Sequence, residues 1–123
     1  MNIIRSLFGG QGDDAQSNRP GVMTAAQAKA LIEGDDRPYI LDVREPGEYQ
    51  GGHINGAKLI PLGQLQQQLS QLPKDQTILC VCASGSRSSS AANLLAQAGY
   101  QVINLRGGMM SWQMAGFPVK RGK

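Results

Sequence analysis

The sequence predicts an α/β fold in which helices cover both faces of a parallel sheet, giving three layers. Two observations predict this class: short apolar runs rich in β-branched residues, and amphipathic segments that separate them along the chain. Apolar runs of this length predict buried strands, and strands that alternate with helices are expected to pair in parallel. The chain has 123 residues, which suits one domain with a single core.

A change of composition divides the chain near residue 20. Residues 1–20 contain the stretch GGQGDDAQSNRP, which has almost nothing to bury, so they predict a flexible N-terminal tail. Their apolar beginning is short, and Arg5 interrupts it, which argues against a signal peptide. Residues 21–123 are expected to form the folded domain.

Four segments predict helices. The first begins at Thr24, which is followed by Gln27 in the pattern of a capping box, and it ends at Gly34. The second carries a leucine stripe and stops at Pro73. The stripe consists of Leu62, Leu65, Leu69 and Leu72. The third, SSSAANLLAQAG, ends at Gly99, and MMSWQMAG predicts a short last helix. Side chains of the third that are expected to face inward are Ala91, Leu94, Leu95 and Ala98.

Four short apolar runs predict buried strands. They are residues 39–43 (YILDV), the segment AKLIPL around Leu59 and Ile60, residues 76–82 (QTILCVC) and residues 101–105 (QVINL). The run 76–82 is the strongest of them. Ligands of parallel sheets gather beyond the carboxyl ends of the strands, so the end of this run is the first candidate for a functional site.

The composition argues against two classes of function. The net charge is +3 and the pI about 9.1, but the basic residues are scattered and aromatic residues make up only 5%, so we expect no nucleic-acid partner. No apolar run approaches the roughly 20 residues of a membrane helix, so we expect no membrane span. Two cysteines separated by one residue cannot form a disulfide framework, which indicates a reducing compartment and predicts a cytoplasmic protein.

A loop without proline follows Cys82 and leads into the third predicted helix. The loop residues are Ala83, Ser84, Gly85, Ser86 and Arg87. Each offers a backbone N–H, and Gly85 permits the positive φ that lets the chain curl. Because N–H groups that curl into a helix N-terminus form an anion cradle, residues 83–86 are candidate substrate-binding residues.

Such a cradle favours the thiolate of Cys82 over its thiol, so it lowers the pKa of this cysteine. Arg87 adds a permanent positive charge, and no Asp or Glu of the loop opposes it. Cys82 and Arg87 are therefore the candidate catalytic residues, with Cys82 as nucleophile. The alternative from these residues alone is a buried cysteine before an ordinary strand-to-helix turn.

Four segments resemble, in order, the motifs of the rhodanese family of sulfurtransferases in its single-domain form. They are LDVREPGEY (41–49), GGHINGA (51–57), CASGSR (82–87) and LRGGMMSWQMAGFPV (105–119). Asn55 replaces the usual proline of the second motif, and Ser111 stands where alanine is common in the fourth. The resemblance covers residues 22–119.

The resemblance implies the rhodanese-like fold with a central five-stranded parallel sheet. It implies that residues 42–44 and 106–108 flank the cysteine loop, which makes Arg44 a further candidate for substrate binding. It also implies a sulfurtransferase: a small sulfur-containing anion such as thiosulfate, or another persulfide, gives its outer sulfur to Cys82. A thiol or a protein cysteine then accepts the sulfur from the Cys82 persulfide. Neither a cofactor nor a metal is expected.

Two other functions stay open at this point. One is a sulfur carrier or interaction module that is not itself an enzyme. The other is a phosphatase or arsenate reductase of the related fold. In the phosphatases the loop has one more residue between cysteine and arginine, whereas here only four residues separate Cys82 from Arg87.

Several further positions predict structural roles. His53, the only histidine, is expected to order a turn, because an anionic sulfur needs no general base. Asp42 and Arg44 are expected to pair and order their own turn. Cys80 lies inside a predicted strand and is expected to be buried and inert, and Trp112 is expected to pack in the core.

Overall fold

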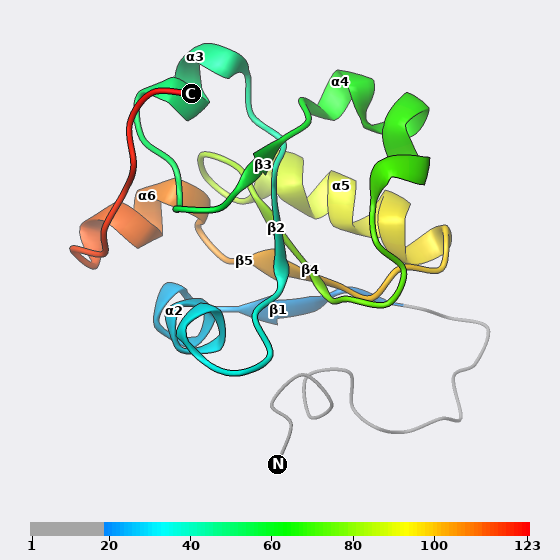
Figure 1. Ribbon diagram of the computed structural model, residues 1–123, viewed down its shortest axis with the longest axis horizontal. Helices are drawn as coiled ribbons and strands as arrows, with labels where there is room; N and C mark the ends of the chain where they lie inside the picture. Colours follow the sequence, from blue (N-terminus) through cyan, green and yellow to red (C-terminus); the bar gives the residue numbers. More distant parts are fainter. Residues whose placement is uncertain (1–18) are drawn as a thin grey trace.

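Five strands form one parallel sheet in the computed structural model, which describes residues 19–123 (Figure 1). The strands are β1 (Gly21–Met23), β2 (Tyr39–Asp42), β3 (Lys58–Leu59), β4 (Ile78–Val81) and β5 (Val102–Leu105). Their order across the sheet is β1-β5-β4-β2-β3, and all four pairings are parallel. The expected five-stranded parallel sheet is therefore confirmed. Residues 1–18 of the predicted tail lie outside the described residues.

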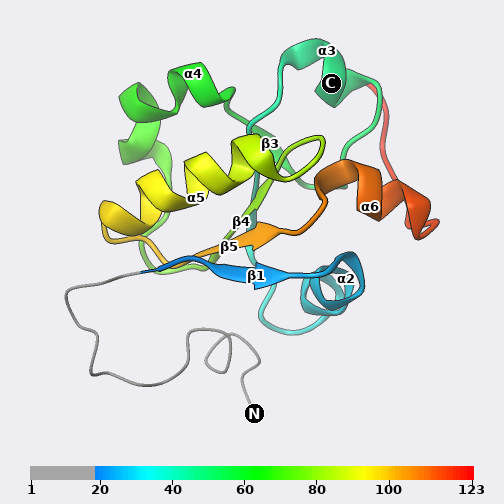
Figure 2. The same cartoon turned by 180° about the vertical axis from the view of Figure 1, so that it is seen from behind.

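Helices cover both faces of this sheet, as the two opposite views show (Figures 1 and 2). They are α2 (Ala25–Glu33), α3 (Pro46–Gln50), α4 (Leu62–Leu65), η1 (Gln66–Gln71, a 3₁₀-helix), α5 (Ser86–Gln97) and α6 (Gly108–Met114). Leu31 of α2 and Trp112 of α6 belong to one core cluster, whereas Leu65 of α4 and Leu95 of α5 belong to another. The two clusters fill the two faces of the sheet, which gives the expected three layers.

The central strand is β4, and all four of its residues are buried. Its side chains alternate between the two faces, as the pleat of a strand requires. Leu79 and Val81 lie in the cluster with α2 and α6, whereas Ile78 and Cys80 lie in the cluster with α4 and α5. Cys82, one residue beyond the strand, belongs to the second cluster as well.

The local signals that predict α2 are confirmed. The backbone N–H of Gln27 donates to Oγ1 of Thr24 at 3.2 Å, and the backbone N–H of Thr24 donates to Oε1 of Gln27 at 3.0 Å. These two bonds form the capping box, which satisfies N–H groups that a helix start leaves free. The helix ends at Glu33, and Gly34 follows as its C-cap.

The leucine stripe forms a broken helix instead of the single expected one. The backbone leaves the helical region at Gln68, inside η1. The carbonyl of Leu69 would accept a helical bond from residue 73, but Pro73 has no N–H to donate. That carbonyl accepts the backbone N–H of Leu72 at 3.0 Å and the hydroxyl of Tyr100 at 2.6 Å. A tighter local bond and a tertiary contact together therefore close the end of this segment.

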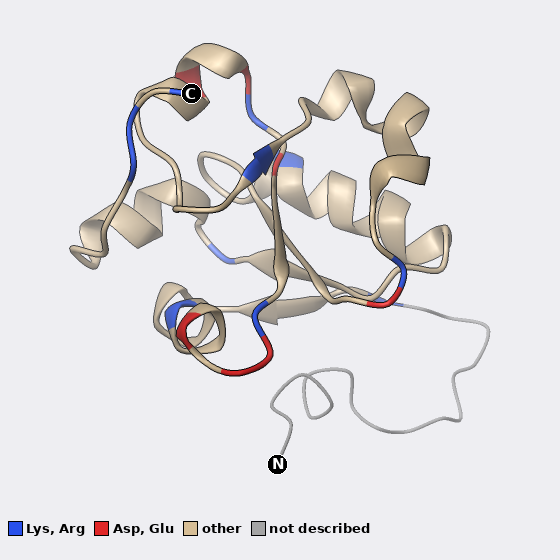
Figure 3. Ribbon diagram, viewed as in Figure 1, with Lys and Arg blue, Asp and Glu red and all other residues tan. Residues whose placement is uncertain are grey.

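The charged residues of the described part of the chain are spread over several elements (Figure 3). Lys29 and Glu33 lie on α2, Glu48 lies on α3, and Arg87 lies at the start of α5. Within residues 19–123, no helix is long and apolar enough to cross a membrane.

Candidate active site

Cys82 lies directly after the central strand, at the carboxyl end of the sheet, and is fully buried. Its Sγ accepts a hydrogen bond from the backbone N–H of Gly85 at 3.0 Å. Gly85 has a φ of +103°, which confirms the expected positive φ, and it precedes the first residue of α5. A side chain here would also meet the backbone N of Gly107 at 3.1 Å. The curl of the loop therefore requires a glycine at this position.

The start of α6 holds the loop from the other side. The backbone N–H of Met109 donates to the carbonyl of Cys82 at 2.8 Å, and that of Met110 donates to the carbonyl of Ala83 at 2.9 Å. Gly108 has a φ of +56°, and a Cβ there would collide with the carbonyl of Cys82. The expected proximity of residues 106–108 to the cysteine loop is thus confirmed. Because helix N–H groups bind these carbonyls, the loop can turn N–H groups toward the sulfur.

A second donor to the sulfur comes from Ser88, in the first turn of α5. Its hydroxyl lies 3.3 Å from Sγ of Cys82 and 3.3 Å from the carbonyl of Gly85, and it also contacts Oδ1 of Asn104. The amide of Asn104 donates to the carbonyl of Gly85 at 3.3 Å. Ser88 has one hydroxyl hydrogen for these three acceptors, and a thiolate is the strongest of them.

Sequence reasoning missed Ser88 and Asn104. Ser88 follows Cys82 by six residues, so a helix beginning after the loop returns it toward the sulfur, which is a signal that sequence reasoning could have used. Asn104 lies on β5 and reaches the loop only through the pairing of β5 with β4. In the sequence, Asn104 stands out only as a polar residue inside an otherwise apolar strand.

The environment lowers the pKa of Cys82 below its ordinary value of 9.0. Burial alone raises this pKa, but hydrogen bonds from the Ser88 hydroxyl and from the backbone N–H groups of Ser88, Gly85 and Ser84 outweigh it. Cys80 has no such donors, and burial together with the nearby charge of Cys82 raises its pKa to about 12. The structure thus separates a thiol that ionises readily from one that stays protonated.

The side chain of Arg87 forms an ion pair with a carboxylate from outside the loop. Its Nη1 donates to Oε1 of Glu48 at 2.8 Å and its Nη2 donates to Oε2 at 2.9 Å. This bidentate bond lowers the pKa of Glu48 to about 2 and raises the pKa of Arg87, to which the charge of Cys82 also contributes. The sequence argument considered only acidic residues of the loop itself, and Glu48 lies 39 residues away on α3.

A model of the rhodanese-like domain matches residues 24–115 of this chain. The chain belongs to the rhodanese-like family. A relative from Bacillus subtilis, "Putative sulfurtransferase YtwF", is 35% identical over 91 residues, which are 74% of this chain and 88% of that protein. "Putative sulfur carrier protein YrkF" from the same organism is 33% identical over 113 residues, covering 89% of this chain and 61% of that protein.

Solved structures agree with this assignment. A rhodanese-related protein from Thermoplasma volcanium has a TM-score of 0.76 and 33% identity, and the match covers 83% of this chain and 97% of that one. The names of the relatives support a general role in sulfur transfer for this rhodanese-like domain.

The buried Arg44 of this rhodanese-like domain binds within its own turn. Its Nε and Nη2 donate to the carboxylate of Asp42 at 2.9 and 2.8 Å, and Nη2 also donates to the carbonyl of Gly52 at 2.8 Å. The expected Asp42–Arg44 pair is confirmed. These bonds direct the guanidinium toward Asp42 and Gly52, so a role of Arg44 in substrate binding stays a prediction.

The single histidine has structural contacts. The ring of His53 is buried and stacks on Tyr49 with 3.7 Å between the ring centroids, and its Nδ1–H donates to the carbonyl of Tyr49 at 2.7 Å. Its backbone pairs with Lys120 near the C-terminus. These contacts order the turn before β3, as the sequence predicts. Trp112 is buried as well, and its Nε1–H donates to the carbonyl of Pro118 at 2.8 Å.

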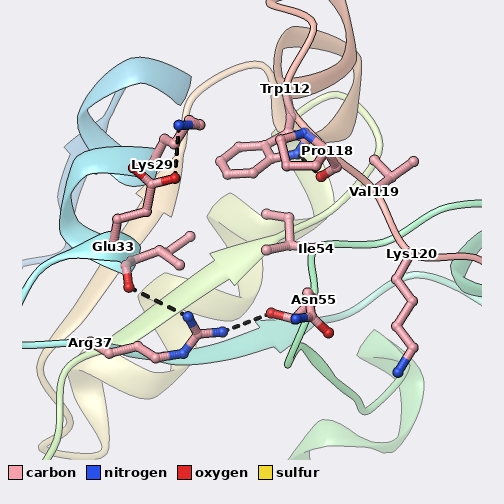
Figure 4. A pocket seen from close by; sticks show the side chains of 10 residues that line it. Lys29, Glu33, Arg37, Ile54, Asn55, Trp112, Pro118, Val119 and Lys120 are labelled. Carbon is pink, nitrogen blue, oxygen red and sulfur yellow. Dashed lines mark hydrogen bonds and ion pairs between the residues drawn. The ribbon is translucent and has the colours of Figure 1, made fainter.

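A pocket of about 500 Å³ lies between α2, Trp112 and the loop before β3 (Figure 4). Its cationic side chains already have partners in two cases: Lys29 pairs with Glu33 at 2.8 Å, and Arg37 donates to the carbonyl of Asn55 at 2.7 Å. Its lining includes no residue of the Cys82 loop. We therefore place the candidate active site at the loop rather than in this pocket.

Proposed function

We propose that this protein is a sulfurtransferase that carries sulfane sulfur as a persulfide on Cys82. The observation that carries the proposal is the position of the Cys82 sulfur between two donors, the N–H of Gly85 at 3.0 Å and the hydroxyl of Ser88 at 3.3 Å. These donors lower the pKa of a thiol that burial alone would keep protonated. A stabilised thiolate at the end of a parallel sheet is suited to attack on an electrophilic sulfur.

In the first step the Cys82 thiolate attacks the outer sulfur of the donor. A new S–S bond forms on Cys82 while the S–S bond of the donor breaks, and the electron pair leaves with the departing group. Thiosulfate releases sulfite, and an organic persulfide releases a thiolate. The N–H groups of residues 83–86 bind the anionic sulfur as it develops, in the manner of an oxyanion hole.

In the second step an acceptor thiolate attacks the outer sulfur of the Cys82 persulfide. The new S–S bond forms on the acceptor, and Cys82 leaves as the thiolate that the loop stabilises. No net oxidation occurs, so the cycle requires no redox cofactor. Arg87, the last residue of the loop, adds positive charge to the site while its side chain pairs with Glu48, and its catalytic role stays a prediction.

Steady-state turnover tests the proposal. Thiosulfate or an alkyl persulfide serves as donor and cyanide or a dithiol as acceptor, with Cys82→Ser as the inactive variant. We expect turnover by the native chain and none by Cys82→Ser. Full activity of the pure Cys82→Ser protein would refute the proposal.

A sulfur carrier is the second candidate function, and the match to a relative with that name favours it. A carrier would load sulfur on Cys82 in one turnover but would release it to a specific protein and only slowly to small thiols. Single-turnover loading followed by discharge to dithiothreitol distinguishes the two. Fast discharge to dithiothreitol supports the enzyme. A persulfide that dithiothreitol discharges only slowly supports the carrier.

A further inference from the structure

The charges of residues 42–48, 82–87 and 105–108, which form the Cys82 loop and the strand ends and helix beside it, balance. Three arginines lie there: Arg44 after β2, Arg87 at the start of α5 and Arg106 after β5. They are matched in number by the carboxylates of Asp42, Glu45 and Glu48. Asp42 pairs with Arg44 at 2.8 Å and Glu48 pairs with Arg87 at 2.8 Å, whereas Glu45 acts on Arg87 through its charge.

Both terminal nitrogens of Arg87 point at Glu48. The two bonds of 2.8 and 2.9 Å use the fork of the guanidinium, which is the same geometry that binds the oxygens of a sulfonate. For Arg87 to bind a donor oxygen in this way, the Glu48 pair has to open. Opening leaves an ionised carboxylate beside the site, and that carboxylate repels a doubly charged donor more than a singly charged one.

Two cations act on the Glu48 carboxylate, Arg87 and Arg44, and Arg44 is already bound to Asp42. The side chains of Arg87 and Glu48 are 36% and 37% exposed, so solvent partly screens the pair. The carboxylate oxygen Oε1 of Glu48 also accepts the backbone N–H of Glu45 at 3.0 Å, which fixes Glu48 on α3. The pair is therefore a defined element of the site.

From this geometry we infer that Glu48 sets donor specificity, favouring alkyl persulfides, which carry at most one negative charge, over the thiosulfate dianion. The inference rests on the proposed function and names its donor class. In the favoured reaction the Cys82 thiolate attacks the outer sulfur of R–S–SH. The S–S bond of the donor breaks, the group R–S⁻ leaves with the electron pair, and Cys82–S–SH forms. Such a donor has no sulfonate, so Arg87 can stay on Glu48.

The test compares kcat/KM for thiosulfate and for 2-hydroxyethyl persulfide, with one dithiol acceptor, in the native chain and in Glu48→Gln. The glutamine keeps an oxygen that can accept the N–H of Glu45, so α3 keeps its cap. We expect the ratio of thiosulfate to persulfide efficiency to rise about three- to fivefold, chiefly through a lower KM for thiosulfate. Glu33→Gln, on α2, makes the same change of net charge away from the loop and is expected to leave the ratio unchanged.

The double variant Glu48→Gln/Arg87→Gln isolates the freed guanidinium, and we expect it to lose the gain. The native chain provides a second measurement: its thiosulfate efficiency should depend only weakly on ionic strength. An unchanged or lower ratio in Glu48→Gln, or a steep loss of native thiosulfate efficiency with salt, overturns the inference. Intact-mass detection of the Cys82 persulfide separates this from failure of the proposed function, because in that case neither donor loads the native chain.

Discussion

The hydroxyl of Ser88, in the first turn of α5, lies 3.3 Å from the Sγ of Cys82. It is fully buried, and its hydroxyl and backbone N–H are among the groups that lower the pKa of Cys82. The loop N–H groups and this side chain act on the same sulfur, so the anion site extends from the loop into the first turn of the helix.

Ser88→Ala removes the hydroxyl donor and is expected to raise the pKa of Cys82. A hydrogen bond to a charged group contributes about 1.5–3 kcal/mol, so we expect sulfur loading at neutral pH to slow by about tenfold or more. Ser90→Ala changes an exposed serine two residues on in the same helix and serves as the control. Equal loading rates in the two variants would show that Ser88 does not act on the sulfur.

The pH dependence of loading follows from the lowered pKa of Cys82. The rate is expected to rise with pH as Cys82 ionises, with a midpoint below the ordinary thiol value of 9.0. In Ser88→Ala the rise should move to higher pH. The rate at which iodoacetamide alkylates Cys82 can be measured by mass spectrometry at each pH. It reports the same titration without a substrate. Alkylation that rises only above pH 9.0 in the native chain would contradict the assignment.

As pH rises, the ionisation of Cys82 is expected to increase the stability of the fold, whereas that of Cys80 is expected to decrease it. Cys82 has a lowered pKa when folded, so its contribution is complete above the ordinary value of 9.0 and is lost as pH falls through the folded pKa. Cys80 has a raised pKa of about 12, so its contribution is complete below 9.0 and is lost as pH rises toward 12. Urea unfolding at a series of pH values measures the free energy of unfolding and checks both signs. Relative to the native chain, Cys82→Ala should flatten the rise of this free energy below pH 9.0. Cys80→Ala should flatten its fall above pH 9.0.

Gly108→Ala is expected to destabilise the protein by about 3 kcal/mol and to disorder the loop. The reason is the positive φ of +56° together with the collision of a Cβ with the Cys82 carbonyl. Gly63→Ala is the matched control, because no atom lies within 4 Å of a Cβ at that position of α4. Urea unfolding measures both, and a Gly108→Ala protein as stable as the native chain would show that α6 does not fix the loop.

Aryl phosphate hydrolysis is expected to be absent. Only four residues separate Cys82 from Arg87, and the fork of Arg87 is bound to Glu48 rather than left open for a phosphate dianion. A p-nitrophenyl phosphate assay, with Cys82→Ser as the blank, provides the measurement. Hydrolysis that depends on Cys82 would assign the site to the phosphatase alternative instead.

Local chemistry made much of the fold predictable from the sequence. The capping box of Thr24 and Gln27 predicts the start of α2, and the apolar run that ends in Cys82 predicts β4. The helix α3 has only five residues and β1 only three, and neither has the periodicity that marks an element. The strand β1 depends on its pairing with β5, whereas α3 begins with a capping box between Glu45 and Glu48, a local signal that sequence reasoning did not use.

The candidate site was predictable where its residues follow one another in the chain. The cysteine, the loop N–H groups and Gly85 lie within a few residues, so their chemistry could be inferred together. Asn104 reaches Ser88 from 16 residues away and Glu48 reaches Arg87 from 39 residues away. Such contacts exist only after β5 pairs with β4 and α3 packs near the start of α5, so sequence reasoning could not give Arg87 its partner.

The central claim is that Cys82, and not Cys80, carries the transferable sulfur. Peptide mapping under non-reducing conditions, after exposure to an alkyl persulfide or thiosulfate, tests it most directly. The account predicts one added sulfur atom on Cys82 in the native chain and in Cys80→Ser, and none in Cys82→Ser. A persulfide mapped to Cys80, or a Cys80–Cys82 disulfide formed during turnover, would contradict it and indicate a two-cysteine redox mechanism.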